Sequence, residues 1–147
     1  MEINILHYNV RKSPRVLNTL LFNRNIANYD VLAIQEPATR IGIADPICLS
    51  RSLWHLARGA TLGRACFYVN KKIAQAKRRL IEHETPDLLT LALDTDTDIL
   101  QIHNVYNPSP QYRQDPGYVR FLTVLRGVLE TQRQYIVLRN FNLHHSL

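Results

Sequence analysis

The sequence has 147 residues, 46% of them hydrophobic, which is enough for one domain with a sizeable buried core. Its 18 lysines and arginines exceed its 12 acidic residues, and the net charge of +6 favours a polyanionic partner such as nucleic acid. Because it contains neither a signal-peptide pattern nor an apolar run long enough for a membrane span, we expect an intracellular protein without a membrane partner.

A strand, a helix and a second strand are predicted at the start of the chain. Residues 2–9 alternate as a strand does, and Ser13-Pro14 is typical of a helix N-cap followed by proline. Helical spacing then continues to about Asn25, and the nearly all-apolar residues 30–35 indicate a strand covered on both faces. We expect the two strands of this crossover unit to be neighbours in one sheet.

The middle of the chain is predicted to hold loops and several strands. Residues 37–63 are rich in proline and glycine, which is typical of loops, and they include a short strand or turn at 52–58. Further strands are predicted over 65–69, 73–81, 88–93 and 99–106. The last two are expected to be antiparallel neighbours joined by the acidic segment "DTDTD".

The "DTDTD" segment, Asp94 to Asp98, imitates the start of a calcium-binding loop. Such a loop needs glycine at its sixth position and glutamate at its twelfth, where this chain has Ile99 and Val105. We interpret the segment as a solvated turn.

The end of the chain predicts a polar loop over 108–117, a helix over 118–129 and a strand over 135–138. No linker divides residues 1–147, so we expect a single domain. The order of elements predicts a mixed sheet system with helices on the outside.

Polar residues follow four of the predicted strands. Asn9, Glu36, and Tyr106 with Asn107 end three of them, and "RNFN" at 139–142 ends the last. In sheets covered by helices, ligands gather at the carboxyl ends of strands. One carboxylate with several amides and a phenol suits a Mg²⁺ ion that keeps most of its waters and also binds a substrate phosphate. Taken singly, the asparagines are equally typical of turns.

Four motifs, "LHYN", "DVLAIQEP", "HNVYNPSP" and "VLRNFNLHH", resemble in order and spacing those of the endonuclease/exonuclease/phosphatase superfamily. The chain looks most like the endonuclease domain of LINE-type (non-LTR) retrotransposons, especially fungal ones, over essentially its whole length. The resemblance implies a two-sheet α/β/β/α sandwich. It also implies hydrolysis of a phosphodiester in duplex DNA with Mg²⁺ or Mn²⁺ as cofactor.

The resemblance assigns roles to individual residues. Asn9 matches the asparagine beside the metal, and Glu36 matches the metal-binding glutamate. Tyr106 matches the tyrosine that contacts the scissile phosphate. Asn142 matches the residue that helps to hold that phosphate and to stabilise charge in the transition state.

Two departures from the family pattern lower the activity that we expect. Arg139-Asn140 replaces the family's Gly-Asp, whose aspartate takes a proton from the attacking water, and an amide cannot do so. The family also continues through further strands to an Asp-His pair, and this sequence ends first. We interpret His144 and His145 as loop histidines near the DNA rather than as a replacement for that pair.

We therefore predict an incomplete, C-terminally truncated sandwich that is inactive or weakly active as a nuclease. The absent strands are expected to leave an apolar part of the second sheet uncovered. The reverse transcriptase domain of such elements lies outside this chain, and a functional protein of this type would be nuclear. Two other functions stay open, namely a non-catalytic nucleic-acid-binding remnant and a phosphatase of the same superfamily.

A basic segment, "KKIAQAKRRL", has two interpretations. It either lies along a phosphate backbone or forms a solvated edge strand whose charges discourage pairing. The residues assigned to nucleic-acid binding are Lys71, Lys72, Lys77, Arg78 and Arg79 of this segment, together with Asn107, His144 and His145. His103 lies within a predicted strand, and we interpret it as a hydrogen-bonded core histidine.

Overall fold

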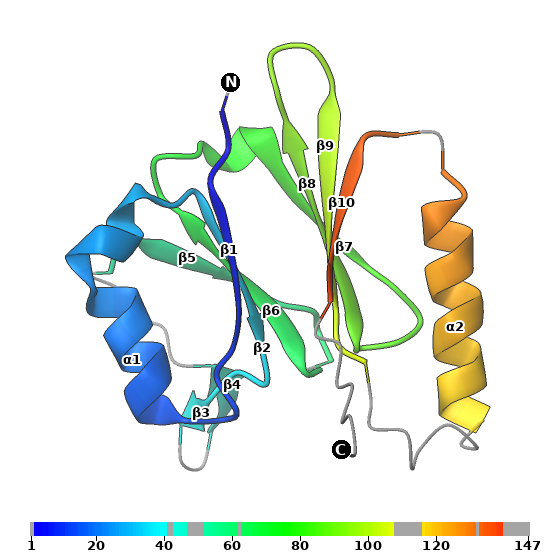
Figure 1. Ribbon diagram of the computed structural model, residues 1–147, viewed down its shortest axis with the longest axis horizontal. Helices are drawn as coiled ribbons and strands as arrows, with labels where there is room; N and C mark the ends of the chain where they lie inside the picture. The colour runs from blue at the N-terminus through cyan, green and yellow to red at the C-terminus, as the bar shows by residue number, and fades with distance from the viewer. Residues whose placement is uncertain are drawn as a thin grey trace, which may run out of the picture.

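Two four-stranded sheets pack face to face, with one helix on the outer side of each (Figure 1). The computed structural model describes residues 2–40, 43–46, 52–61, 63–107, 116–131 and 133–139. The layers run in the order α1, first sheet, second sheet, α2, so the predicted α/β/β/α sandwich is confirmed.

The first sheet has the strand order β1-β2-β6-β5. Its strands are β1 Ile5–Asn9, β2 Val31–Gln35, β6 Ala65–Asn70 and β5 Trp54–Ala57. The strands β1 and β2 are parallel neighbours, as their crossover pattern predicts. A separate two-stranded sheet, β3 Thr39–Arg40 with β4 Ile43–Pro46, lies within the segment that the sequence predicts as loops.

Helix α1, Pro14–Phe22, begins as predicted, because Ser13 Oγ accepts a hydrogen bond from the Val16 N–H at 3.3 Å. It ends earlier than the predicted Asn25. The reason is local, since the Asn23 side chain accepts from the Asn25 N–H at 2.9 Å and caps a short 3₁₀ helix, η1 Arg24–Asn28.

The second sheet has the order β10-β9-β8-β7. Its strands are β10 Tyr135–Arg139, β9 Ile99–Val105, β8 Leu88–Asp94 and β7 Arg78–Glu82. Helix α2, Pro116–Leu129, connects β9 to β10, and these two strands are parallel. The strands β8 and β9 are antiparallel, and hydrogen bonds between Thr95 and Asp98 close the acidic turn that joins them.

The predicted strand over 73–81 is wrong in its first half. Residues Gln75–Lys77 form a 3₁₀ helix, η2, and β7 begins only at Arg78. The chain must pass from β6 in the first sheet to β7 in the second at this point, and an extended strand cannot make that turn.

Three apolar clusters hold the layers together, and alternate residues of each strand face different clusters. Leu17 and Leu21 of α1 pack on Leu32, Ile34 and Tyr68 of the first sheet. The cluster between the sheets contains Val31, Ala33, Phe67, Val69, Leu89, Leu91, Leu93 and Ile102. Phe121 of α2 packs on Leu88 and Val105 of the second sheet.

Strand β10 carries exposed apolar side chains at one edge of the second sheet. Tyr135 is 41% exposed, Ile136 is 38% exposed and Val137 is 36% exposed. Among the described residues, this edge strand thus presents a partly exposed apolar surface. None of the helices in the described part of the chain has the length and apolar character that crossing a membrane requires.

His103 is a buried core histidine, as predicted, with 0% of its surface exposed. Its Nδ1 makes a 2.7 Å hydrogen bond with Thr90 Oγ1, which makes a second 2.7 Å bond with His83 Nε2. Burial, with a smaller contribution from His83, lowers the pKa of His103 to about 4.

This histidine predicts a loss of stability in mild acid. The pKa of His103 in the folded state lies below its value in the unfolded state. Its contribution to the free energy of unfolding is therefore fully present above about pH 6.5 and falls as the pH drops toward 4. We expect the free energy of unfolding to fall by roughly 2 kcal/mol between pH 7 and pH 5 from this group alone. Urea unfolding at the two pH values, with His103→Gln as the comparison, measures it. An equal pH dependence in both proteins would contradict the assignment.

Candidate active site

The site lies where strands of both sheets end at the same end of the molecule. Gln35, the last residue of β2, donates to the Val105 carbonyl of β9 at 2.6 Å. In return, Asn104 of β9 donates to the carbonyl oxygens of Ile34 and Cys66 in the first sheet, each at 3.0 Å. These buried bonds bring the residues that follow β2 and β9, Glu36 and Tyr106, to neighbouring positions.

Asn9 and Glu36 are in direct contact at the tips of β1 and β2. The Asn9 Nδ2 donates to Glu36 Oε1 at 3.2 Å, and Asn9 Oδ1 accepts from the Arg11 N–H at 2.8 Å. In this conformation Asn9 orients the Glu36 carboxylate.

The backbone at both strand tips is in the left-handed region, which residues other than glycine seldom adopt. The φ angles are 50° at Arg11, 57° at Lys12 and 47° at Glu36. Two hydrogen bonds of 2.8 Å hold this arrangement, from the Lys12 N–H to the Glu36 carbonyl and from the Glu36 N–H to the Arg64 carbonyl. Backbone strain of this kind clusters at functional sites.

Tyr106 reaches the same place from the second sheet. It is 9% exposed, and its N–H donates to the Asp87 carbonyl at 2.8 Å. The Arg64 guanidinium lies over its ring, 4.3 Å from the centroid, and Glu36 and Arg64 are the charged groups that influence its hydroxyl. Burial and the neighbouring Glu36 raise the pKa of Tyr106, against the opposing effect of Arg64.

The sequence reasoning missed Arg64 and Asp87. Arg64 donates from Nε to Asp87 Oδ1 at 3.0 Å and from Nη2 to Asp87 Oδ2 at 2.6 Å, a bidentate pair. The hydrogen bonds to Asp87 raise the pKa of Arg64. Both residues directly precede strands, β6 and β8, and the signal for them was a charged residue immediately before each apolar run.

A cavity of 470 Å³ opens beside these groups. Its wall includes Lys12, Glu36, Arg64 and Asp87. Two cations and two carboxylates around one hollow, next to a phenol, form a site able to hold a cation and an anionic group together.

The donor set fits a hydrated Mg²⁺ better than a cation held wholly by the protein. Among the described residues, no group of three or more His, Cys, Asp or Glu side chains is arranged to hold a metal. Glu36 offers one carboxylate, and Asn9 lies beside it. Mg²⁺ commonly binds through one or two carboxylates and keeps several waters.

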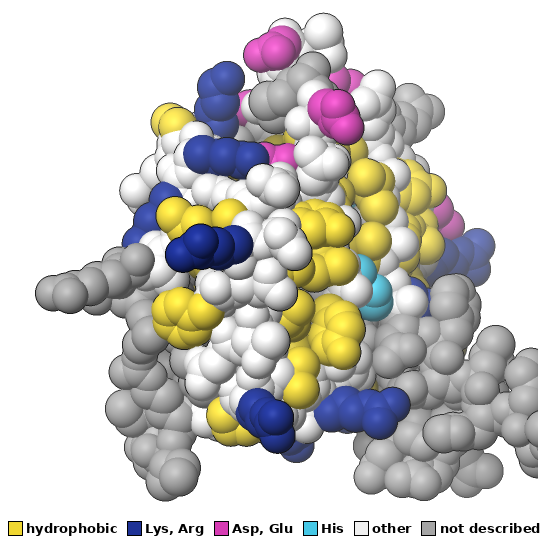
Figure 2. All heavy atoms as spheres, turned by 60° about the vertical axis from the view of Figure 1, so that its left-hand side comes forward, with side chains coloured by type: hydrophobic (Ala, Val, Ile, Leu, Met, Phe, Trp, Pro, Cys, Tyr) yellow, Lys and Arg dark blue, Asp and Glu magenta, His cyan; other side chains and the backbone are white. Residues whose placement is uncertain are grey.

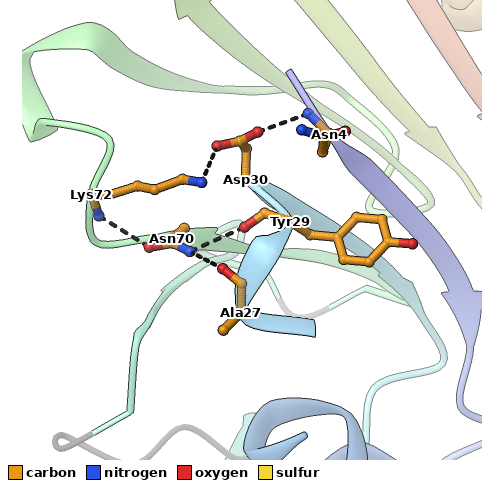
Figure 3. A network of polar contacts seen from close by, with 6 residues as sticks. All are labelled: Asn4, Ala27, Tyr29, Asp30, Asn70 and Lys72. Atoms are coloured by element: carbon orange, nitrogen blue, oxygen red, sulfur yellow. Dashed lines mark hydrogen bonds and ion pairs between the residues drawn. The ribbon is translucent and has the colours of Figure 1, made fainter. Parts of the chain in front are cut away.

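The basic segment lies at the opposite end of the sheets from Glu36 and Tyr106, because β6 ends and β7 begins there. Lys72 pairs with Asp30 at 2.8 Å in the network of Figure 3, where Asn4 also donates to Asp30 and Asn70 donates to two backbone carbonyls. Lys71 Nζ donates to the Ser52 carbonyl at 2.7 Å. Both lysines thus have intramolecular partners, and nucleic-acid binding by Lys71, Lys72, Lys77, Arg78 and Arg79 stays a prediction.

The charge distribution at that end is mixed. On the face in Figure 2, Lys and Arg side chains are dispersed, and acidic side chains gather at the top, the end at which the β8–β9 turn lies in Figure 1. Burial alone would raise the pKa of Asp30, but the bond from the Asn4 N–H and the pair with Lys72 outweigh it and lower that pKa.

Of the remaining predicted site residues, only Asn107 lies in the part of the chain that the structure describes. Asn107 is buried and directly follows Tyr106. The predictions for Asn140, Asn142, His144 and His145 lie outside the described residues. Strand β10 ends at Arg139, in register with Val105 of β9.

Three solved structures, one of them an endonuclease/exonuclease/phosphatase family protein, share this fold, which confirms the fold implied by the motifs. The endonuclease domain of TRAS1, a telomere-specific non-LTR retrotransposon, superposes with a TM-score of 0.62 at 12% identity, over 95% of this chain and 58% of that one. An endonuclease/exonuclease/phosphatase family protein from Leptotrichia buccalis gives 0.60 at 13%, over 96% and 67%. Humanized D. rerio TDP2 gives 0.53 at 14%, over 93% and 60%.

At these identities the similarity defines the fold, and the chain spans roughly three fifths to two thirds of the lengths of those structures. No protein-family model matches the sequence, and no curated protein matches it.

Proposed function

We propose that this chain is a Mg²⁺-dependent endonuclease-like domain of retrotransposon type, which binds duplex DNA and has low nicking activity. The observation that carries the proposal is the contact of Glu36 with Asn9 at a strand end that buried hydrogen bonds join to the strand end of Tyr106 in the other sheet. The similarity in fold to a retrotransposon endonuclease domain supports a nucleic-acid substrate.

In this proposal Glu36 would hold the metal and Asn9 would orient the Glu36 carboxylate. The Tyr106 hydroxyl would donate a hydrogen bond to a non-bridging oxygen of the scissile phosphate. When bound, Mg²⁺ would neutralise charge on that phosphate and make a coordinated water more acidic. Lys12, on the wall of the adjoining cavity, would attract the DNA backbone on one side of the cleaved bond.

The low activity is proposed from the sequence at position 140. An asparagine there cannot accept a proton from the attacking water, and loss of such help costs about 10²- to 10⁴-fold in rate. The bulky Arg139 before it is a second change from the glycine of the resembled family.

Substitution of Glu36 by alanine tests the metal site. We expect the wild-type chain to bind Tb³⁺, a luminescent substitute for Mg²⁺, and Glu36→Ala to weaken that binding by at least about tenfold, since it removes the carboxylate proposed to hold the metal. Any Mg²⁺-dependent plasmid nicking should disappear in the same variant. Glu130→Ala, which removes an exposed carboxylate on α2's C-terminal side, is the matched control. Equal Tb³⁺ binding by Glu36→Ala and wild type would refute the proposed site.

The net charge of +6 favours one alternative, a non-catalytic nucleic-acid-binding domain. It predicts DNA binding that weakens steeply with salt and is unchanged in Glu36→Ala, with no nicking under any condition. Hydrolysis of small phosphoesters in preference to DNA would instead indicate the phosphatase alternative.

A further inference from the structure

We infer that Arg64 is a positioning residue that holds Glu36 and Tyr106 in one fixed geometry across the two sheets. This inference rests on the proposed function, because it assigns Arg64 a role in the reaction of that same site. Arg64 itself touches neither metal nor scissile phosphate in this assignment, and it acts through the two residues that do.

Arg64 contacts both Glu36, which follows a strand of the first sheet, and Tyr106, which follows a strand of the second. Its carbonyl accepts from the Glu36 N–H at 2.8 Å and so holds Glu36 in its left-handed backbone conformation. Its guanidinium lies over the Tyr106 ring, 4.3 Å from the centroid. Its bidentate partner Asp87 accepts from the Tyr106 N–H through its carbonyl at 2.8 Å. Arg64 therefore restrains the Glu36 backbone through its own carbonyl and the Tyr106 ring through its side chain, while its partner Asp87 restrains the Tyr106 backbone.

The loops that carry this pair are in direct backbone contact. A Cβ on Gly63 would lie 1.8 Å from the Pro86 carbonyl oxygen, so only glycine permits the approach. Gly63 precedes Arg64 and Pro86 precedes Asp87, which means that the approach of the two loops sets the Arg64–Asp87 distance. The bidentate Arg64–Asp87 pair then links the two sheets at the wall of the cavity.

A purely structural ion pair would have a different effect. The Arg64 side chain is 40% exposed, and ion pairs at such positions contribute little to stability. If Arg64 acts by positioning, its removal lowers turnover far more than this stability change explains, and it does so without weakening substrate binding in proportion.

The position of Arg64 between Asp87 and Tyr106 also predicts the effect of replacing it by lysine. A lysine supplies the charge, but it lacks the planar fork that bonds both Asp87 oxygens while lying on the Tyr106 ring. Arg64→Lys should therefore recover stability and DNA affinity, and it should recover turnover only in part.

The test combines ¹⁹F NMR of protein labelled with 3-fluorotyrosine and nicking kinetics of wild type, Arg64→Ala and Arg64→Lys. Tyr106→Phe assigns the Tyr106 resonance, and Arg126→Ala, which breaks a surface Arg–carboxylate pair on α2, is the control. We expect Mg²⁺ to shift the Tyr106 resonance in wild type and in Arg126→Ala. In Arg64→Ala we expect a broadened resonance and a shift with Mg²⁺ of less than half the wild-type size.

The kinetics, measured in the wild-type and Asn140→Asp chains, should show kcat lowered about tenfold or more by Arg64→Ala with KM changed less than about threefold. An unchanged Mg²⁺ response and unchanged kcat in Arg64→Ala would overturn the role of Arg64. Failure of Mg²⁺ to shift the Tyr106 resonance in wild type would instead overturn the proposed metal site, and the positioning role with it. A rise in KM alone would make Arg64 a binding residue.

Discussion

Replacement of Asn140 by aspartate is expected to increase the rate of Mg²⁺-dependent nicking of supercoiled plasmid DNA by about 100-fold or more. The substitution changes the shape of the side chain little, and it supplies the proton acceptor that the asparagine lacks. The strand that precedes position 140 ends beside the strand that precedes Tyr106, so position 140 directly follows a strand end of the same group. The rate is measured from the conversion of supercoiled to open-circular plasmid at saturating Mg²⁺.

The control for this prediction is Asn18→Asp, the same chemical change at an exposed position of α1. Asn18→Asp should nick at the wild-type rate, and Asn140→Asp combined with Glu36→Ala should lose the gain. If Asn140→Asp binds Tb³⁺ as wild type does but nicks no faster, the amide at position 140 is not what limits the activity.

Replacement of Asn104 by alanine is expected to lower the free energy of unfolding by about 3 kcal/mol. The side chain has 0% exposure, and its two donated bonds satisfy carbonyls of Ile34 and Cys66 across the sheet interface. Its removal leaves Gln35 without one acceptor, at 3.4 Å in the native protein, and opens a void between the sheets. Each buried group left without a partner costs about 1–3 kcal/mol.

Urea unfolding at pH 7 measures this loss, with Asn18→Ala as the exposed control that should stay within about 0.5 kcal/mol of wild type. The same variant should loosen the site, because Asn104 and Gln35 hold together the strand ends that carry Glu36 and Tyr106. A change in unfolding free energy below about 1 kcal/mol would mean that water or neighbouring groups replace the lost bonds.

Three residues of the candidate site could be predicted from the sequence because they lie at the ends of predicted strands. Asn9 ends a predicted strand and Glu36 and Tyr106 lie at the ends of two others, and the carboxyl ends of β1, β2 and β9 lie at one end of the sandwich. Strand periodicity and helix caps depend on neighbouring residues only, so the start of α1 and the turn between β8 and β9 were predicted correctly. The early end of α1 was not, because capping by Asn23 competes locally with the helix pattern.

Arg64 and Asp87 were missed because they precede strands instead of following them. Antiparallel pairing reverses the direction of β6 and β8, and this reversal brings the amino ends of those strands to the site. The two residues are 23 positions apart and belong to different sheets, so no local pattern relates them. The basic segment differs, since its charges are close in sequence but lie at the opposite end of the sheets from this site, and its role in nucleic-acid binding stays a prediction.

Most of the strands and helices could be predicted from the sequence alone, because periodicity, capping and turn chemistry act over a few residues. The same holds for the polar residues that end β1, β2 and β9 and for the burial of His103. The packing of the two sheets against each other could not be predicted in this way, and it is set by the tertiary structure. It depends on bonds such as Asn104 to Ile34, across 70 positions of sequence, and on the close approach of Gly63 to Pro86. Such long-range packing determines which charged groups lie close together. In this protein it places Arg64 and Asp87 beside Glu36 and Tyr106, which the sequence alone had indicated.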